Sequence, residues 1–235
     1  MNILITGCSK GLGFGLTRFY LEAGHKVYGI SRSGNAELGN YQDFKHLKQD
    51  LSDFDSVRKN IPDFLGGIKT MDLVILNAGI LNDIKDMADT SLEEIKHVMD
   101  VNVWANKVLI DRLFVELNEI MQIVAISSGA AVNGSRGWNA YALSKATLNM
   151  LIDLYSREHV NTHFIAMAPG LIDSGMQDYI SSLPPEVDFP VVKRLKEAKG
   201  TEQMPPPSRA AEIVAKAIEK VFSYESGSFV DVRQF

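Results

Sequence analysis

Two side chains four residues apart, Tyr141 and Lys145, lie in a stretch that we predict to be helical. Residues at i and i+4 share one helix face, so the lysine ammonium would lie beside the phenol. A free tyrosine loses its proton near pH ~10, and a neighbouring positive charge lowers that pKa. Such a phenol can give a proton to a carbonyl oxygen or take one from an alcohol. The alternative interpretation is a solvated surface pair, which is common at this spacing.

A serine thirteen residues before the tyrosine adds a second polar group to this pair. Ser128 directly follows the apolar run Gln122–Ser127, which we predict to be a strand. A hydroxyl at a strand end could hydrogen-bond the same substrate oxygen as the phenol. Together with the glycine-rich loop described next, Ser128 favours a catalytic interpretation of Tyr141 and Lys145.

The segment TGCSKGLG, Thr6–Gly13, follows the apolar run Ile3–Ile5 near the start of the chain. Gly7 suits a tight turn, Gly11 lets a phosphate approach the backbone, and Gly13 permits close packing of a helix on a strand. A helix that starts here would point free N–H groups and its positive dipole end at that phosphate. The alternative is a glycine-rich turn without a ligand, but the strand–turn–helix context favours a dinucleotide.

Short apolar runs alternate with longer amphipathic stretches, as in a parallel sheet covered by helices on both faces. The predicted strands are Asn2–Thr6, Lys26–Ile30, Lys45–Leu47, Leu73–Leu76, Gln122–Ser127, His163–Ala168 and Ser228–Val232. The predicted helices are Leu12–Ala23, Asp55–Ile61, Leu92–Leu117, Tyr141–His159 and Arg209–Phe222. We therefore predict an α/β fold in which residues 1–235 form a single, doubly wound domain with a seven-stranded parallel sheet.

The composition is that of an ordinary globular protein, with 46% hydrophobic residues and a formal charge of −5. No basic face is apparent, which argues against nucleic acid or an anionic membrane as a partner. The single cysteine, Cys8, excludes an internal disulfide and fits a reducing compartment, so we expect a cytoplasmic protein. We interpret Cys8 as a packing residue. The five histidines show no metal-ligand spacing, and we predict no metal site.

The glycine loop, read as Thr-Gly-x-x-x-Gly-x-Gly, resembles the cofactor loop of the short-chain dehydrogenase/reductase family. Further motifs resemble those of the family and follow in its order: Asp50-Leu51-Ser52, Asn77-Ala78-Gly79, Asn102 in DVNVWA, Ser128 with Tyr141-x-x-x-Lys145, and Pro169-Gly170-Leu171-Ile172-Asp173-Ser174. Ser174 stands where threonine is more usual. The resemblance covers most of the chain. It implies a Rossmann fold and an oxidoreductase that interconverts a ketone or aldehyde and an alcohol by hydride transfer.

The resemblance also assigns roles to four residues. Tyr141 would be the general acid/base, and Lys145 would lower its pKa and hold the nicotinamide ribose. Ser128 would orient the substrate oxygen, and Asn102 would hold a water that completes a proton relay. The predicted cofactor-binding residues are Gly7, Ser9, Lys10, Gly11, Leu12, Gly13, Ser31, Arg32, Asp50, Leu51, Asn77, Ala78, Gly79, Tyr141, Lys145, Pro169, Gly170, Ile172 and Ser174.

The end of the second predicted strand indicates which dinucleotide is used. NAD enzymes usually present a carboxylate there to the ribose 2′-hydroxyl, whereas a 2′-phosphate prefers an arginine. The chain continues here as Ser31-Arg32-Ser33, without an acid, and Lys10 in the glycine loop is a second cation. We therefore predict NADP(H). The alternative is that both cations are solvated surface charges.

The proline-containing stretch Ser174–Pro207 is long for a connection in a compact domain, so we expect a functional or mobile loop. Together with Tyr179 it could form a lid over cofactor and substrate. Trp138 and Met176 could line the substrate pocket, although core packing is an equally good interpretation.

The two longest predicted helices carry apolar residues on more than one face. These residues are Val103, Trp104, Val108, Leu148, Leu151 and Leu154. In the resembling family such helices form dimer interfaces, and we predict a homodimer or homotetramer. The ending SGSFVDVRQF makes completion of the pocket by a neighbouring subunit less expected. That ending and SKATLNM are similar to a carbonyl-reductase-like subgroup related to bacterial C-factor and insect sniffer.

Two other function classes can be weighed against the enzyme. A redox-sensing or signalling protein would bind NADP without turnover, but relatives with that role often lose the tyrosine or lysine. A sugar-nucleotide epimerase would need a different glycine spacing and a longer chain. The substrate itself does not follow from the sequence.

Overall fold

The computed structural model describes all 235 residues and contains one seven-stranded sheet, in the order β3-β2-β1-β4-β5-β6-β7. The strands are β1 (Asn2–Thr6), β2 (Lys26–Ser31), β3 (Phe44–Lys48), β4 (Thr70–Leu76), β5 (Glu119–Ile126), β6 (His163–Ala168) and β7 (Phe229–Asp231). Every strand pair is parallel. The predicted doubly wound Rossmann fold is confirmed. The strand order reverses between β1 and β4, where such sheets bind ligands beyond their carboxyl ends.

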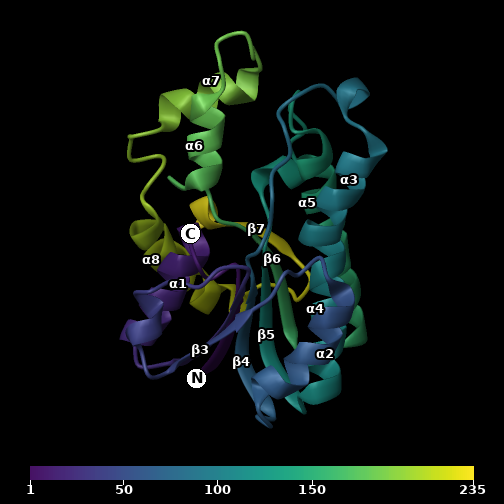
Figure 1. The fold of residues 1–235 in the computed structure, drawn as a ribbon, viewed down its shortest axis with the longest axis vertical. Coiled ribbons are helices and arrows are strands. Elements are labelled where there is room, and N and C mark those ends of the chain that lie inside the picture. The colour runs from purple at the N-terminus through teal and green to yellow at the C-terminus, as the bar shows by residue number, and fades with distance from the viewer.

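Helices cover both faces of the sheet (Figure 1). The helices are α1 (Gly11–Glu22), α2 (Phe54–Leu65), α3 (Leu92–Met99), α4 (Ala105–Glu116), α5 (Asn139–Glu158), α6 (Gly175–Ser182), α7 (Pro190–Ala198) and α8 (Pro207–Lys220). Helices α1 and α8 pack on one face, and α2, α4 and α5 pack on the other. None of the helices is long and apolar enough to cross a membrane.

The two core layers explain why the strands are continuous apolar runs. In β1, Leu4 belongs to the core under α2, α4 and α5, whereas Ile3 and Ile5 belong to the core under α1 and α8. Successive side chains of a strand point to opposite faces, so a sheet covered twice buries every residue. All three side chains are fully buried.

The predicted single helix Leu92–Leu117 is interrupted. A π-helical segment, Asp100–Trp104, separates α3 from α4 and contains the buried Asn102. π-Helical segments are rare within α-helices and frequently occur at functional sites. Here the segment lies beside the start of α5, which carries Tyr141 and Lys145.

The interpretation of Ser174–Pro207 as a loop is wrong, because the segment contains α6 and α7. Pro190 occupies the first turn of α7, where a proline costs no hydrogen bond. Val191, Val192 and Leu195 are buried on one side of that short helix. Both helices rise above the carboxyl-terminal edge of the sheet (Figure 1).

Candidate active site

A cavity of about 640 Å³ lies beyond the carboxyl ends of the strands. Segments that follow β1, β2, β4, β5, β6 and β7 line it, as do α5, α6 and α7. Every sequence-predicted site residue lines this cavity except Gly13 and Asn102. The structure therefore brings the predicted cofactor loop and the predicted catalytic residues to one place.

The glycine loop is held in position by the end of β4. The hydroxyl oxygen of Thr6 accepts hydrogen bonds from the backbone N–H groups of Asn77 and Ala78, both at 2.9 Å. The side-chain amide of Asn77 donates to the Thr6 carbonyl at 2.9 Å. Gly7 adopts a left-handed φ of 69° and its N–H donates to the carbonyl of Ile30. Asn77 therefore supports the loop as well as lining the cavity.

The start of α1 fits a bound phosphate. A Cβ added to Gly13 would lie 2.2 Å from the Gly7 carbonyl oxygen, so only glycine lets the helix begin this close to the strand. A Cβ on Gly11 would have only Ser174 within 4 Å, at 3.7 Å, so the backbone at Gly11 faces open space. No acidic residue occupies the first turn of α1, and its positive dipole end is uncompensated.

The segment after β2 forms the other end of the cavity. The Ser31 hydroxyl is buried and bonds Cys8 Sγ, His46 Nε2 and the Ser33 carbonyl, so it has little capacity for a ligand. Arg32, in contrast, is exposed to the cavity and forms no ion pair. Ser33 donates to the hydroxyl of Ser9, which connects this segment to the glycine loop.

Two residues at this end support the sequence interpretation. The carboxylate of Asp50 accepts hydrogen bonds from the backbone N–H and the hydroxyl of Ser52, which lower the pKa of that carboxyl and keep it charged. Cys8 is buried, and burial raises the pKa of its thiol. A protonated, buried thiol is a packing residue and a poor nucleophile, as predicted.

Three of the four residues with predicted catalytic roles, Ser128, Tyr141 and Lys145, line the cavity together. Ser128 follows β5, and its hydroxyl interacts with the phenol of Tyr141 on α5. The Lys145 Nζ donates to the carbonyl of Ile126 at 2.7 Å and lies 5.8 Å from the centre of the Tyr141 ring. Tyr141 and Lys145 are both buried.

Burial is the largest influence on the pKa values of Tyr141 and Lys145. It raises the pKa of the Tyr141 phenol, and the hydrogen bond with Ser128 partly offsets that rise. The lowering of the Tyr141 pKa by Lys145 remains a prediction, because burial is the main cause of the shift in the polypeptide. The phenol is therefore neutral at physiological pH, which is the form that donates a proton to a carbonyl oxygen.

The lysine is the group that titrates near physiological pH. Burial lowers the pKa of Lys145 to about 8, so its ammonium is present below that pH and is lost above it. We expect kcat/KM for the predicted nicotinamide dinucleotide, which reports groups of the free protein, to fall as the pH rises through about 8. Initial rates across the pH range test this. An arginine keeps its charge throughout this range, so Lys145→Arg should not show the fall in kcat/KM near pH 8. A fall that persists in this variant would belong to another titrating group.

Asn102 lies next to the catalytic residues but outside the cavity lining. Its side-chain oxygen accepts from the Ile80 N–H at 2.8 Å, and its amide donates to the Ile80 carbonyl and to the Ser144 hydroxyl. Its own carbonyl accepts from the Asn106 side chain at 2.8 Å. These contacts join the π-helical segment to α5 and to the chain after β4. The water proposed for Asn102 remains a prediction.

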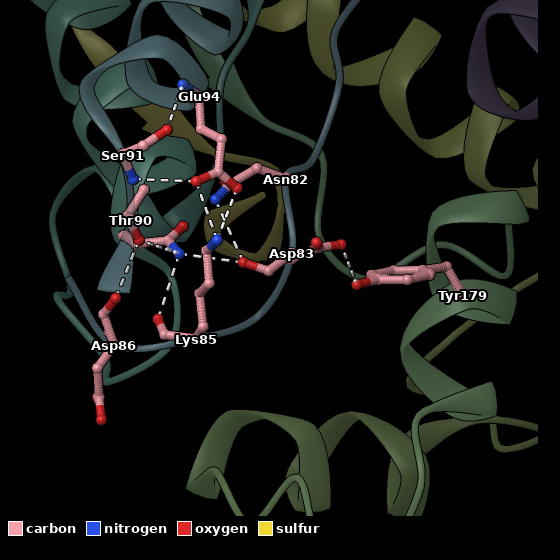
Figure 2. Close-up of polar contacts among 9 residues, drawn as sticks. Asn82, Asp83, Lys85, Asp86, Thr90, Ser91, Glu94 and Tyr179 are labelled. Carbon is pink, nitrogen blue, oxygen red and sulfur yellow. Dashed lines mark hydrogen bonds and ion pairs between the residues drawn. The ribbon is translucent and has the colours of Figure 1, made fainter. Parts of the chain in front are cut away.

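Helices α6 and α7 cover the cavity on the side of Tyr141. The apolar cluster that contains Tyr141 and Trp138 also contains Ile180, Leu195 and other side chains of this segment. The Tyr179 hydroxyl donates to Asp83 at 2.9 Å, which Figure 2 shows as a contact between α6 and the segment before α3.

The segment that receives this contact is itself well supported. Glu94 and Ser91 form a capping box at the start of α3, and Lys85 pairs with Glu94 at 2.7 Å (Figure 2). The Asn139 amide donates to the carbonyls of Asp83 and Lys85. The first turn of α5 and the Asp83 segment are thus one connected structure.

Among the cavity residues missed from the sequence are Arg194 on α7, Asp231 at the end of β7 and Arg233 just after it. No motif marks them. Strand β7 lies beside β6, with Asp231 opposite Ala168, so the chain end reaches the edge that holds Ser128. For Asp231 and Arg233, the position of the last strand in the sheet was therefore the only feature that could have placed them at the cavity.

The family assignment follows from comparison with known proteins. A family profile described as short chain dehydrogenase matches residues 1–183. The chain belongs to the short-chain dehydrogenase/reductase family. A benzil reductase of Bacillus subtilis that forms (S)-benzoin is 31% identical over 246 residues, covering 99% of this chain and 98% of that protein. The chain is thus an oxidoreductase of the carbonyl/alcohol type.

Two further family members are similar over most of the chain. An NADPH-dependent pterin aldehyde reductase of Arabidopsis thaliana is 28% identical to this chain. The alignment covers 74% of this chain and 75% of the plant protein. The solved short chain dehydrogenase/reductase YIR035C of Saccharomyces cerevisiae superposes with a TM-score of 0.86 at 26% identity. The superposition covers 98% of this chain and 95% of the yeast chain. Members of the family bind a nicotinamide dinucleotide, and the cavity described above contains the residues predicted to bind it.

Proposed function

We propose that this protein is an NADP(H)-dependent carbonyl reductase in which Tyr141 is the general acid/base. The observation that carries the proposal is the convergence of Ser128, Tyr141 and Lys145 in one cavity with the glycine loop. A sensor that binds NADP without turnover has no need for this complete set, and the relatives named as reductases favour the enzyme.

Each residue has a defined part in the reduction. Ser128 and Tyr141 donate hydrogen bonds to the substrate carbonyl oxygen, which polarises the carbonyl carbon. The bound nicotinamide supplies the hydride. Tyr141 then transfers its phenolic proton to the oxygen. The Lys145 ammonium, already fixed by the Ile126 carbonyl, stabilises the phenolate that remains and would hold the ribose hydroxyls of the cofactor.

The charges around the Arg32 segment support NADP(H) over NAD(H). Arg32 and Lys10 are exposed, line the cavity and have no acidic partner. The neighbouring Ser33 hydroxyl donates to the hydroxyl of Ser9, the residue before Lys10. A 2′-phosphate would bind the arginine fork and the lysine, whereas a 2′-hydroxyl would meet no carboxylate at the end of β2.

The substrate side of the cavity favours an apolar carbonyl compound. Trp138, Leu171, Met176 and Leu195 line it near Tyr141. Because the Bacillus subtilis relative is named for benzil, we propose aromatic ketones of this kind as substrates. Trp138 and Met176 would then line the pocket.

The experiment follows NADPH absorbance with a panel of aldehydes, ketones and quinones that includes benzil. We expect turnover of aromatic ketones and much slower turnover with NADH. Tight NADPH binding without turnover of any carbonyl would contradict the proposal and favour the sensor.

We further propose that residues 174–207 form the substrate-binding lid of this single domain and that the Tyr179–Asp83 contact holds it closed. Tyr179→Phe removes only the donor of that hydrogen bond. A hydrogen bond contributes about 0.5–1.5 kcal/mol, so we expect KM for the carbonyl substrate to rise roughly 2- to 10-fold with NADPH binding unchanged. Tyr224→Phe, at an exposed tyrosine outside the cavity, is the matched control. Equal KM values for both variants would contradict the proposal that this hydrogen bond holds the lid closed.

An exposed apolar surface supports a homo-oligomer, at least a dimer. Val103, Val108 and Leu148 are buried in the core, so the prediction that they lie at a subunit interface is wrong. The exposed apolar residues of this region are Trp104, Leu143, Met150 and Leu154. Three of them lie on α5 and one immediately before α4. We propose this surface as the subunit interface, with solution mass as its test.

A further inference from the structure

The end of the chain places a fixed guanidinium beside the catalytic serine. Arg233 and Asp231 both line the cavity that contains Ser128 and Tyr141. A Cβ added to Gly129, the residue after Ser128, would lie 3.8 Å from Arg233 Nη2. The guanidinium is thus a neighbour of the serine that orients the substrate oxygen.

Asp231 holds this guanidinium in one orientation. Its carboxylate is nearly buried and accepts from the Arg233 N–H at 3.0 Å, from Nε at 2.8 Å and from Nη2. The same contacts lower the pKa of the Asp231 carboxyl and keep it charged. Asp231 lies at the end of β7, opposite Ala168 of β6, so the sheet itself sets its position.

The guanidinium retains donors for a ligand. An arginine has five side-chain N–H groups in a rigid fork. Two atoms, Nε and Nη2, are engaged by Asp231, and no other protein partner is present. The Arg233 side chain is 68% exposed, so its remaining N–H groups are open to the cavity.

We propose that Arg233 is a specificity-determining residue that binds a second oxygen of the substrate, next to the carbonyl that is reduced, and that Asp231 positions it. The inference rests on the proposed function, because it takes the reacting oxygen to lie between Ser128 and Tyr141. A second acceptor adjacent to that oxygen comes within reach of a donor beside Gly129. The site therefore selects 1,2-dicarbonyl compounds over simple ketones.

Two substrates of matched shape test this. Benzil carries two adjacent carbonyl groups, and deoxybenzoin carries a methylene in place of one of them. In Arg233→Met, we expect the ratio of kcat/KM for benzil to that for deoxybenzoin to fall about 10-fold, with the deoxybenzoin value within about 2-fold of wild type. Asp231→Asn should lower the same ratio less, because it loosens the guanidinium without removing it. Arg157→Met, on the surface of α5 outside the cavity, should not change it.

The outcomes separate the inference from the function on which it rests. An unchanged ratio in Arg233→Met, or an equal loss on both substrates, overturns the role of Arg233. If Tyr141-dependent reduction of deoxybenzoin persists in that case, the carbonyl reductase proposal stands. If the wild-type protein reduces neither ketone, the proposed function fails, and the inference fails with it. Thermal unfolding of each variant shows that it is folded.

Discussion

Tyr141→Phe should reduce kcat/KM for carbonyl reduction by about 10²- to 10⁴-fold, the usual contribution of a positioned general acid. The variant loses the phenol that lines the cavity with Ser128 and Lys145 and that the proposal makes the proton donor. The phenyl ring keeps its packing against Trp138, whose ring centre is 5.4 Å away, so the fold is preserved. NADPH binding, measured by fluorescence titration, should change little.

Tyr155→Phe is the matched control for this variant. Tyr155 lies on the same helix and is also buried, but its hydroxyl donates to Asp111 outside the cavity. We expect this change to lower stability and to leave turnover near wild type. Undiminished turnover in Tyr141→Phe with intact NADPH binding would remove Tyr141 from the mechanism.

Arg32→Ala should weaken NADPH binding by about 10- to 150-fold, because a hydrogen bond to a charged group contributes about 1.5–3 kcal/mol. NADH has no 2′-phosphate, so its dissociation constant should stay within about 2-fold. The selectivity for NADPH over NADH therefore falls by nearly as much as the affinity for NADPH. Titration of wild type and variant with both dinucleotides measures it.

Arg58→Ala is the control for the Arg32 variant, since Arg58 is an exposed arginine on α2 that pairs with Asp55 away from the cavity. It should leave both dissociation constants unchanged. Tighter binding of NADH than NADPH by the wild-type protein would contradict the NADP(H) proposal. So would an equal loss for both dinucleotides in Arg32→Ala.

The central strands were predictable because a sheet covered on both faces buries most of their residues. The run Ile3–Ile5 is apolar at every position for that reason. Helix ends were less predictable. Helix α2 continues through Pro62 to Leu65, beyond the predicted end at Ile61, and burial of Phe64 and Leu65 accompanies this extra turn. Packing on the sheet outweighed the proline signal here.

The two helices of residues 174–207 were missed because they are short. Helix α6 has 8 residues and α7 has 9, so their periodicity is weak beside the prolines that surround them. Pro190 was interpreted as a breaker, but it starts α7. The physical signal was present in Val191, Val192 and Leu195, whose spacing matches one helix face.

The candidate site was predictable where local sequence carries the chemistry. The glycine loop and the Tyr141–Lys145 pair each lie within one short segment. Asp231 and Arg233 were not predictable, because only the pairing of β7 with β6 brings them to Ser128. The burial that raises the pKa of Tyr141 was also not predictable, since the spacing to Lys145 says nothing of how deeply the phenol lies in the protein.

The most direct test of the central claim is the transfer of deuterium from labelled NADPH to a carbonyl carbon. The wild-type protein is incubated with benzil and NADPH that is deuterated at the nicotinamide carbon, in separate samples for each face of the ring. We expect deuterium on the carbinol carbon of benzoin from one of the two samples, and none with Tyr141→Phe over the same time. Benzoin without deuterium from either sample, or no benzoin in the presence of tightly bound NADPH, would contradict the account.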